Sequence, residues 1–257
     1  MKSTMIHEPL TKLQCCPTSD GAAAAVLVSQ AFLDERPELK SQAVLIAGQC
    51  LATDSPDLFS KSSIDLVGYQ MSKTAAKTAL DEAGLKPSDI KVCELHDCFS
   101  ANEMVTIDAL GLCPPGKAHE MVRAGDITYG GNMVINPSGG LISKGHPLGA
   151  TGLAQCAELI WHLRGWANNR LVPDTTACLQ HNLGLGGAVV CSVYKRADGK
   201  ANSPVSDEEV AKLSGVGYNP AVEAKGFTKE MVDRVLSKKA RSAWALQDTE
   251  QRVEARF

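Results

Sequence analysis

Hydrophobic and polar positions along this chain alternate between two patterns, which predict strands and helices in turn. The apolar run Ala43–Ala47 predicts a strand, and residues 72–83, capped by Ser72 and ended at Gly84, predict a helix. Residues 149–165 carry apolar side chains at the three-and-four spacing of an amphipathic helix. The other expected elements are a strand at 90–95, a helix at about 102–110, and strands at 175–181 and 187–195. Alternating strands and helices indicate an α/β domain built on a largely buried mixed sheet.

Two segments share a glycine turn followed by small apolar residues. The first covers residues 19–31, and the second covers residues 183–195. This weak internal repeat predicts a buried apolar segment at both places.

Residues 197–257 differ in composition from the rest of the chain. A linker-like passage at 198–204 leads to charged segments near 206–213 and 228–252, which we expect to be helical. Few large apolar residues are available there, so Trp244 and Leu246 are the expected anchors.

The overall composition is that of an ordinary globular domain, with 44% hydrophobic and 21% charged residues. A net charge of −3 gives no reason to expect nucleic acid or an anionic membrane as a partner. No apolar run is long enough to span a bilayer, which predicts no transmembrane segment. The nine cysteines follow neither a disulfide framework nor paired metal-ligand spacing, so we expect reduced thiols.

Candidate chemistry is concentrated in two short stretches. His146 lies between two glycine-rich segments, directly before the predicted helix at 149–165. The free N–H groups of a helix N-terminus favour developing negative charge, and glycines let the backbone approach a ligand closely. The second stretch, His96-Asp97-Cys98-Phe99, follows the strand expected at 90–95. Side chains at such strand ends commonly carry the chemistry of α/β proteins.

A third stretch, residues 180–187, contains His181 and Asn182 before a run of glycines. Together the three stretches resemble the active-site loops of the thiolase superfamily, and within it the sterol-carrier branch. Most thiolases have a cysteine where His181-Asn182 stand here, and in the sterol-carrier branch that cysteine belongs to the His-Asp-Cys-Phe loop. The resemblance covers roughly residues 5–196.

The resemblance implies a layered α/β fold with a mixed five-stranded sheet. Its C-terminal half is expected to be essentially complete and its N-terminal half truncated, because no residue here matches the acyl-accepting cysteine of the family. Residues 1–62 then correspond to the end of the N-terminal half, residues 63–196 to the C-terminal thiolase domain, and residues 197–257 to a tail.

The resemblance also implies the chemistry: thiolysis of a 3-oxoacyl-CoA, or the reverse Claisen condensation of two acyl-CoA thioesters. Cys98 would move the proton on carbon as a thiolate, its pKa lowered by nearby histidines, while His96 and His146 hydrogen-bond the thioester oxygen. His146 would also activate the acyl-accepting cysteine. His181 and Asn182 are possible further members of the site, and Ser19, Gly145 and Gly184 are candidate coenzyme A contacts.

The resemblance also implies expectations about cofactors, assembly and location. Coenzyme A is a substrate, and no metal or redox cofactor is needed. The full-length form is expected to be a homodimer. The C-terminal tripeptide Ala255-Arg256-Phe257, which lacks the usual leucine, suggests a peroxisomal location, with the cytoplasm or mitochondrion as alternatives.

Each assignment has a plainer alternative. Cys98 could be a small buried apolar residue, His146 and His181 could be satisfied by local hydrogen bonds, and Asp97 could cap the following helix. The chain as a whole could be a non-catalytic subunit that binds acyl-CoA or assembles with another chain. A metal-dependent hydrolase is disfavoured because no carboxylate lies at ligand spacing from the histidines. By the thiolase interpretation, this chain alone is expected to be an inactive acyltransferase fragment.

Overall fold

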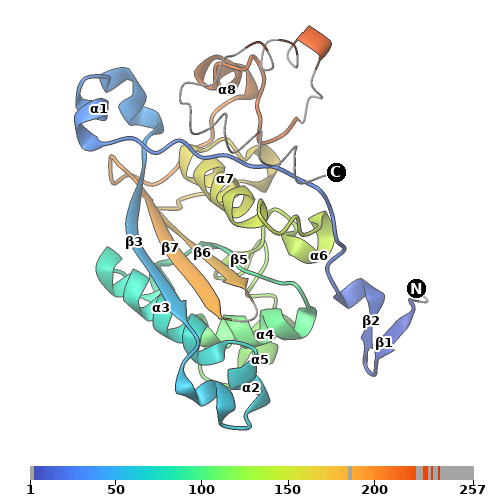
Figure 1. Ribbon diagram of the computed structural model, residues 1–257. Coiled ribbons are helices and arrows are strands. Elements are labelled where there is room, and N and C mark those ends of the chain that lie inside the picture. The colour runs from blue at the N-terminus through green and yellow to red at the C-terminus, as the bar shows by residue number, and fades with distance from the viewer. Residues whose placement is uncertain (1–2, 185–186, 224–227, 231–232, 234–236, 238–257) are drawn as a thin grey trace. The chain divides into compact units, whose positions relative to one another are not determined.

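The computed structural model describes residues 3–184, 187–223, 228–230, 233 and 237 (Figure 1). The chain divides into two compact units, Met1–Val222 and Glu223–Phe257. In the second unit, Lys229 and Asp233 form an ion pair of 2.6 Å. The expected helix at 228–252 falls mostly outside the described residues, as do Trp244, Leu246 and the C-terminal tripeptide.

The first unit is built on the mixed five-stranded sheet that the resemblance implied. The strand order is β3-β7-β6-β4-β5. Strand β4 runs parallel to β5 and β6, whereas β7 is antiparallel to both β6 and β3. The strands are β3 (Val44–Thr53), β4 (Val92–Glu94), β5 (Val134–Ile135), β6 (Ala177–Gly184) and β7 (Ala188–Arg196). The first unit is therefore an α/β fold, as the sequence pattern predicted.

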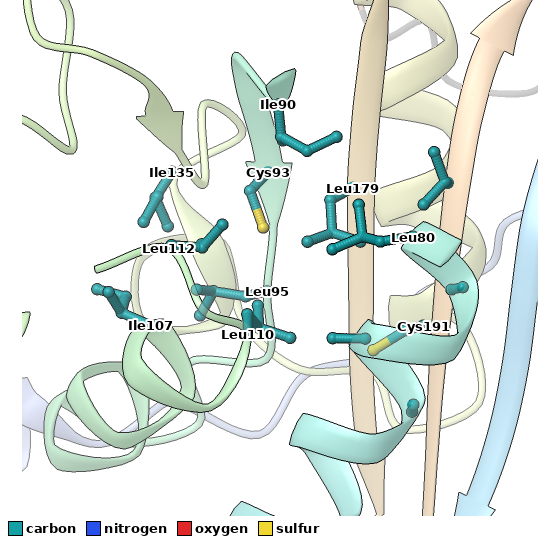
Figure 2. Close-up of a cluster of buried hydrophobic side chains, with 14 of the residues drawn as sticks. Leu80, Ile90, Cys93, Leu95, Ile107, Leu110, Leu112, Ile135, Leu179 and Cys191 are labelled. Atoms are coloured by element: carbon teal, nitrogen blue, oxygen red, sulfur yellow. The ribbon is translucent and has the colours of Figure 1, made fainter. Parts of the chain in front are cut away.

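Helices cover both faces of this sheet. The principal ones are α3 (Tyr69–Ala83), α4 (Ser100–Ala109), α5 (Ala118–Ala124), α6 (Gly140–Lys144) and α7 (Thr151–Arg164). Alternate strand residues pack on opposite sides, as the two-residue period of a strand requires. Cys93 and Leu179 join Leu80 of α3 and Ile107 of α4 in one buried cluster (Figure 2). Their strand neighbours belong to a second buried cluster, which contains Val92, Cys178, and Leu159 and Leu163 of α7.

Shorter elements complete the described chain. They are β1 (Met5–His7), β2 (Leu10–Thr11), α1 (Gln30–Asp34), α2 (Ser63–Leu66), α8 (Asp207–Leu213) and the 3-10 turns Lys12–Gln14, Pro37–Gln42, Pro56–Phe59, Pro87–Asp89 and Asn168–Arg170. The pattern predicted α4, α7, β6, β7 and α8 to within a few residues. It did not predict β5, α5 or α6, which are too short to show a period.

The expected start of the helix at 72–83 is wrong. Helix α3 begins at Tyr69 after Gly68, whose φ of 90° lies in the left-handed region. Ser72 is therefore a buried residue inside the helix and not its cap. The predicted end at Gly84, with φ 66°, is confirmed.

The buried apolar segment expected at 19–31 is also wrong. Residues 19–29 are neither helix nor strand, and Val26 and Leu27 are 91% and 76% exposed. The second copy of the proposed repeat does contain the buried strand β7, so only one of the two segments behaves as expected.

All nine cysteines are free thiols, as expected from their spacing. None of the helices in the described part of the chain combines the length and apolarity needed to cross a bilayer.

Candidate active site

Two loops bring the predicted histidines together. The His96 loop (residues 96–99) joins β4 to α4, and the His146 loop (residues 145–147) joins α6 to α7. The ring centroids of His96 and His146 lie 4.9 Å apart, with the ring planes at 88°. The edge of one imidazole therefore faces the other ring.

His96 is a buried, neutral imidazole. Burial, and secondarily the neighbouring His146, lowers its pKa to about 4. Asn102, on the first turns of α4, donates from Nδ2 to the backbone oxygen of His96 at 2.6 Å. The Nδ1 atom of His96 is buried, and among the described residues it has no hydrogen-bond partner.

The hydrogen bonds of His146 favour one neutral tautomer. Its Nδ1 atom lies 2.7 Å from Oγ1 of Thr151, and that hydroxyl donates to the backbone oxygen of Pro147 at 3.1 Å. With its proton directed to Pro147, the hydroxyl accepts from Nδ1–H, so the lone pair is on Nε2. Burial lowers the pKa of His146, while Asp97 opposes this shift and Lys144 adds to it. His146 is therefore suited to accept a proton at Nε2.

The pKa of the Cys98 thiol differs from the value expected from the sequence. Its side chain is buried, and burial, followed by the neighbouring Cys16, raises its pKa to about 11. The expectation of a thiol pKa lowered by the histidines is wrong, because desolvation disfavours the charged thiolate. At neutral pH, Cys98 carries its proton.

A segment before the sheet pairs with both loops. The backbone N–H of Cys16 donates to the oxygen of Cys98 at 2.9 Å, and Cys15 forms an antiparallel bridge with Phe99. The N–H of His146 donates to the oxygen of Pro17 at 3.1 Å, and Thr18 bridges to His146 in the parallel sense. This bridging segment, residues 15–18, thus joins the His96 loop to the His146 loop through backbone hydrogen bonds.

Ser19 and Gly145 are two of the candidate coenzyme A contacts, and they lie against each other. A Cβ atom at Gly145, where φ is 96°, would overlap the side chain of Ser19. An open hollow of about 330 Å³ lies alongside, lined by Ser19–Ala23 and Pro147–Ala150. Pro147, which lines this hollow, directly follows His146 in the sequence.

His181 and Asn182 point to opposite faces of the sheet. His181 is fully buried and contacts Ser72 of α3 and the backbone of His96. Asn182 donates from Nδ2 to Oε1 of Gln155 on α7 at 3.1 Å. Gly184 is exposed and pairs with Ala188 at the end of the β6–β7 hairpin. The structure therefore places His181 next to the His96 loop and directs Asn182 toward α7.

Three further residues shape the site and were not singled out as site residues from the sequence. Thr151 orients His146 and Asn102 holds the His96 loop. Glu103 is partly buried near Asp97, and burial raises its pKa to about 7. Their positions on the first turns of the helices that follow the two loops are the only signal that marks them in the sequence.

Asp97 does cap a helix, but not the one that follows it. Its Oδ1 and Oδ2 atoms accept from the N–H groups of Leu141 and Ile142 in α6, at 2.6 and 3.4 Å. The expected cap of the following helix, α4, is therefore replaced by a cap of α6.

A mixed five-stranded sheet with helices on both faces, and a His-Asp-Cys loop packed against a Gly-His-Pro loop, defines a thiolase-type α/β domain. Residues 53–195 match the family described as Thiolase C-terminal domain-like. The chain belongs to this thiolase family.

Its relatives include both sterol carrier proteins and thiolases. It is 54% identical to Sterol carrier protein 2 of Bos taurus over 235 residues, which is 91% of this chain and 43% of that protein. It is 37% identical to an Acetyl-CoA acetyltransferase of Methanothermobacter thermautotrophicus over 197 residues, which is 76% of this chain and 50% of that protein. The chain thus spans less than half the length of the sterol carrier protein it matches.

A solved structure supports the fold alone. The Ltp2-ChsH2(DUF35) aldolase superposes with a TM-score of 0.58 at 21% identity, covering 76% of this chain and 49% of that one.

Proposed function

We propose that residues 1–257 carry the proton-transfer and thioester-binding half of a thiolase-type acyltransferase site. The observation that carries the proposal is the contact between the His96 and His146 rings, in loops that also contain Cys98. The substrates would be acyl-CoA thioesters and coenzyme A, with no metal or redox cofactor. The full-length form would be a homodimer, and the acyl-accepting cysteine would come from outside this chain.

The protonation states support a division of roles. Neutral His146, with its Nε2 lone pair free, can take the proton of a thiol nucleophile. Neutral His96 can donate a hydrogen bond to the thioester oxygen, an interaction typically worth about 3–4 kcal/mol as the oxyanion forms. His146 can donate in the same way only after it has gained a proton.

The buried thiol of Cys98 is in the protonation state that the cleavage step uses. When the carbon–carbon bond of a 3-oxoacyl thioester breaks, the electron pair remains on the α-carbon of the departing enolate, which needs a proton. A protonated Cys98 supplies it and becomes the thiolate, and solvent returns the proton afterwards. Because the pKa of Cys98 is about 11, this proton is present at neutral pH. In the reverse direction, the thiol must first lose this proton before it can act as a base.

Exchange of the α-proton of an acyl-CoA for deuterium tests the proposal, because it needs enolate formation but no acyl-accepting cysteine. Acetyl-CoA in D₂O with the whole chain should incorporate deuterium faster than in buffer. The rate should rise with pH, by up to about tenfold per unit between pH 7 and 9, as the Cys98 thiolate becomes available. Mass spectrometry of the recovered acetyl-CoA measures it.

Two variants make the test specific. Cys98→Ala should abolish the exchange, whereas Cys113→Ala, the same change at a cysteine outside the two loops, should leave it intact. If acetyl-CoA binds but no exchange exceeds the buffer rate, the chain is the non-catalytic binding subunit and the proposal fails. Complete thiolysis by the chain alone would show that it contains its own acyl acceptor.

A peroxisomal location belongs to the same proposal. It is supported by the tripeptide Ala255-Arg256-Phe257 and by the thiolase relationship. Imaging an N-terminal fluorescent fusion with and without these three residues tests it, and a cytoplasmic or mitochondrial signal from the intact fusion would contradict it.

A further inference from the structure

The carboxylate of Asp97 reaches the backbone of α6. It accepts from the N–H groups of Leu141 and Ile142, as described above, and the residue is only 3% exposed. Asp97 lies between His96 and Cys98 in the sequence, while α6 leads directly into the His146 loop. One carboxylate therefore connects the two loops of the candidate site.

The contact is close because residue 140 is a glycine. A Cβ atom at Gly140 would overlap the carboxylate of Asp97, and Gly140 also has φ 63°. The fit between this carboxylate and the start of α6 thus leaves no room for a side chain at that position.

A second carboxylate binds the residues just before α6. Glu94, at the end of β4, accepts from the N–H and the hydroxyl of Ser138, at 3.0 and 2.9 Å. Lys144, the last residue of α6, donates to the same hydroxyl at 2.9 Å. The start of segment 138–144 is therefore hydrogen-bonded to the strand that carries the His96 loop, and Nζ of Lys144 at its end lies 3.9 Å from Oε2 of the same Glu94.

Asp97 also acts on His146 through its charge. Its carboxylate raises the pKa of His146, against the effects of burial and of Lys144. The His146 ring is also in direct contact with the titratable ring of His96. A substitution at Asp97 can therefore move His146, change its pKa, or do both.

We propose that Asp97 is a positioning residue, which sets the place of His146 relative to His96 and Cys98 by holding the start of α6. The inference rests on the proposed function, because it assigns Asp97 a part in the same reaction. Asp97 contacts the backbone that carries His146 and needs no contact with substrate. A misplacement of about 1 Å in a reacting group can cost about 100-fold in rate, so a small movement of α6 would be measurable.

Two variants separate position from charge. Asp97→Asn removes the charge and sets an amide N–H against one of the two backbone N–H groups of α6. Gly140→Ala keeps the charge but pushes α6 away from Asp97. The matched controls are Asp89→Asn, which alters a carboxylate that caps the turn at Pro87–Asp89, and Gly84→Ala, at a glycine with φ 66° and open space around it.

We expect both test variants to slow α-proton exchange by about tenfold or more, with the Kd for acetyl-CoA changed by less than about threefold. The controls should match the wild type. In NMR spectra, both test variants should weaken the contact between the His96 and His146 ring protons, and only Asp97→Asn should lower the pKa of His146. Thermal melts verify that each variant is folded.

The outcomes distinguish the two proposals. If the wild type shows no exchange, the proposed function fails, and the ring contact measured by NMR still decides whether Asp97 positions His146. If both test variants are folded and keep the ring contact and the wild-type exchange rate, Asp97 is not a positioning residue. A fall in acetyl-CoA affinity without a change in the bound exchange rate would also overturn the inference.

Discussion

His181 holds His96 by its backbone: Nδ1 of His181 accepts a hydrogen bond from the backbone N–H of His96 at 3.4 Å. Because Nδ1 is the acceptor, the ring proton lies on Nε2, which is 3.0 Å from Oγ of Ser72. Burial lowers the pKa of His181 to about 3, so the ring remains neutral and both contacts persist at physiological pH. One imidazole thus joins β6, α3 and the His96 loop.

We expect Ser72→Ala to lower the free energy of unfolding by about 1–3 kcal/mol, because it leaves the Nε2–H of His181 buried without an acceptor. Urea unfolding at pH 7 measures the change. Ser88→Ala, at an exposed serine, should change stability by less than about 0.5 kcal/mol. Equal stabilities for the two variants would mean that the contact between Ser72 and His181 contributes nothing to the fold.

The buried histidines and the largely buried glutamates make the stability of the fold depend on pH in opposite directions. The folded-state pKa values of His96 and His181, about 4 and about 3, lie below the ordinary 6.5, so these rings reduce stability as the pH falls below about 6.5. The folded-state pKa values of Glu94 and Glu103 are raised to about 7 from 4.5, so these carboxyls reduce stability as the pH rises from about 4.5 to 7. The two effects offset each other in that range.

The variant Glu103→Gln should reveal how much one carboxyl contributes to this pH dependence of stability. Its stability relative to the wild type should increase between about pH 4.5 and 7, by up to about 1.4 kcal/mol per pH unit, and level off above pH 7. Urea unfolding of both proteins across this range gives the difference. A constant difference between Glu103→Gln and the wild type would contradict the raised pKa.

Cys98 should react slowly with iodoacetamide, because only the thiolate is nucleophilic and the pKa of this thiol is raised to about 11. Its alkylation rate, followed by mass spectrometry of the peptide that contains it, should still be rising at pH 10. In denaturing urea, the same peptide should level off near an ordinary thiol pKa of about 8.5. A plateau near that value in the folded protein would disprove the raised pKa of Cys98.

The exposed stretch with Val26 and Leu27, and the edge strand β3, should make the chain self-associate. Leu45 and Leu51 on β3 are 55% and 65% exposed, and β3 is an outer strand of the sheet. Such edges and apolar patches promote association. The double variant Val26→Glu, Leu27→Glu should lower the sedimentation coefficient in analytical ultracentrifugation, whereas Val216→Glu, at a 54% exposed side chain elsewhere, should not. A monodisperse wild-type monomer would refute the expectation.

The sequence predicts four of the five strands of the sheet and the longer helices, because these segments have apolar runs or periodic apolar positions. The two-residue strand β5 has neither. The sequence also relates His96 and His146 to one site through their motifs, and the fold places their rings in contact. The roles of these side chains in catalysis remain predictions.

Features that depend on distant partners could not be predicted in this way. Asp97 and Leu141 are 44 positions apart, and Leu141 lies on a helix too short to show a period. Ser72 has the residue type of a helix cap, but its true environment is set by His181, which is 109 positions away. The segment at 19–31 has the composition of a buried strand, yet burial requires a partner that composition cannot specify.

The bridging segment shows that the boundary of the family domain is not the boundary of the site. The family match begins at residue 53, whereas the backbone that pairs with both histidine loops lies at residues 15–18. Grafting these loops onto another scaffold would therefore require Cys15–Thr18 to be transplanted with them. In a library of domain recombinants, crossovers between residues 18 and 53 should retain the sheet more often than the geometry of His96 and His146.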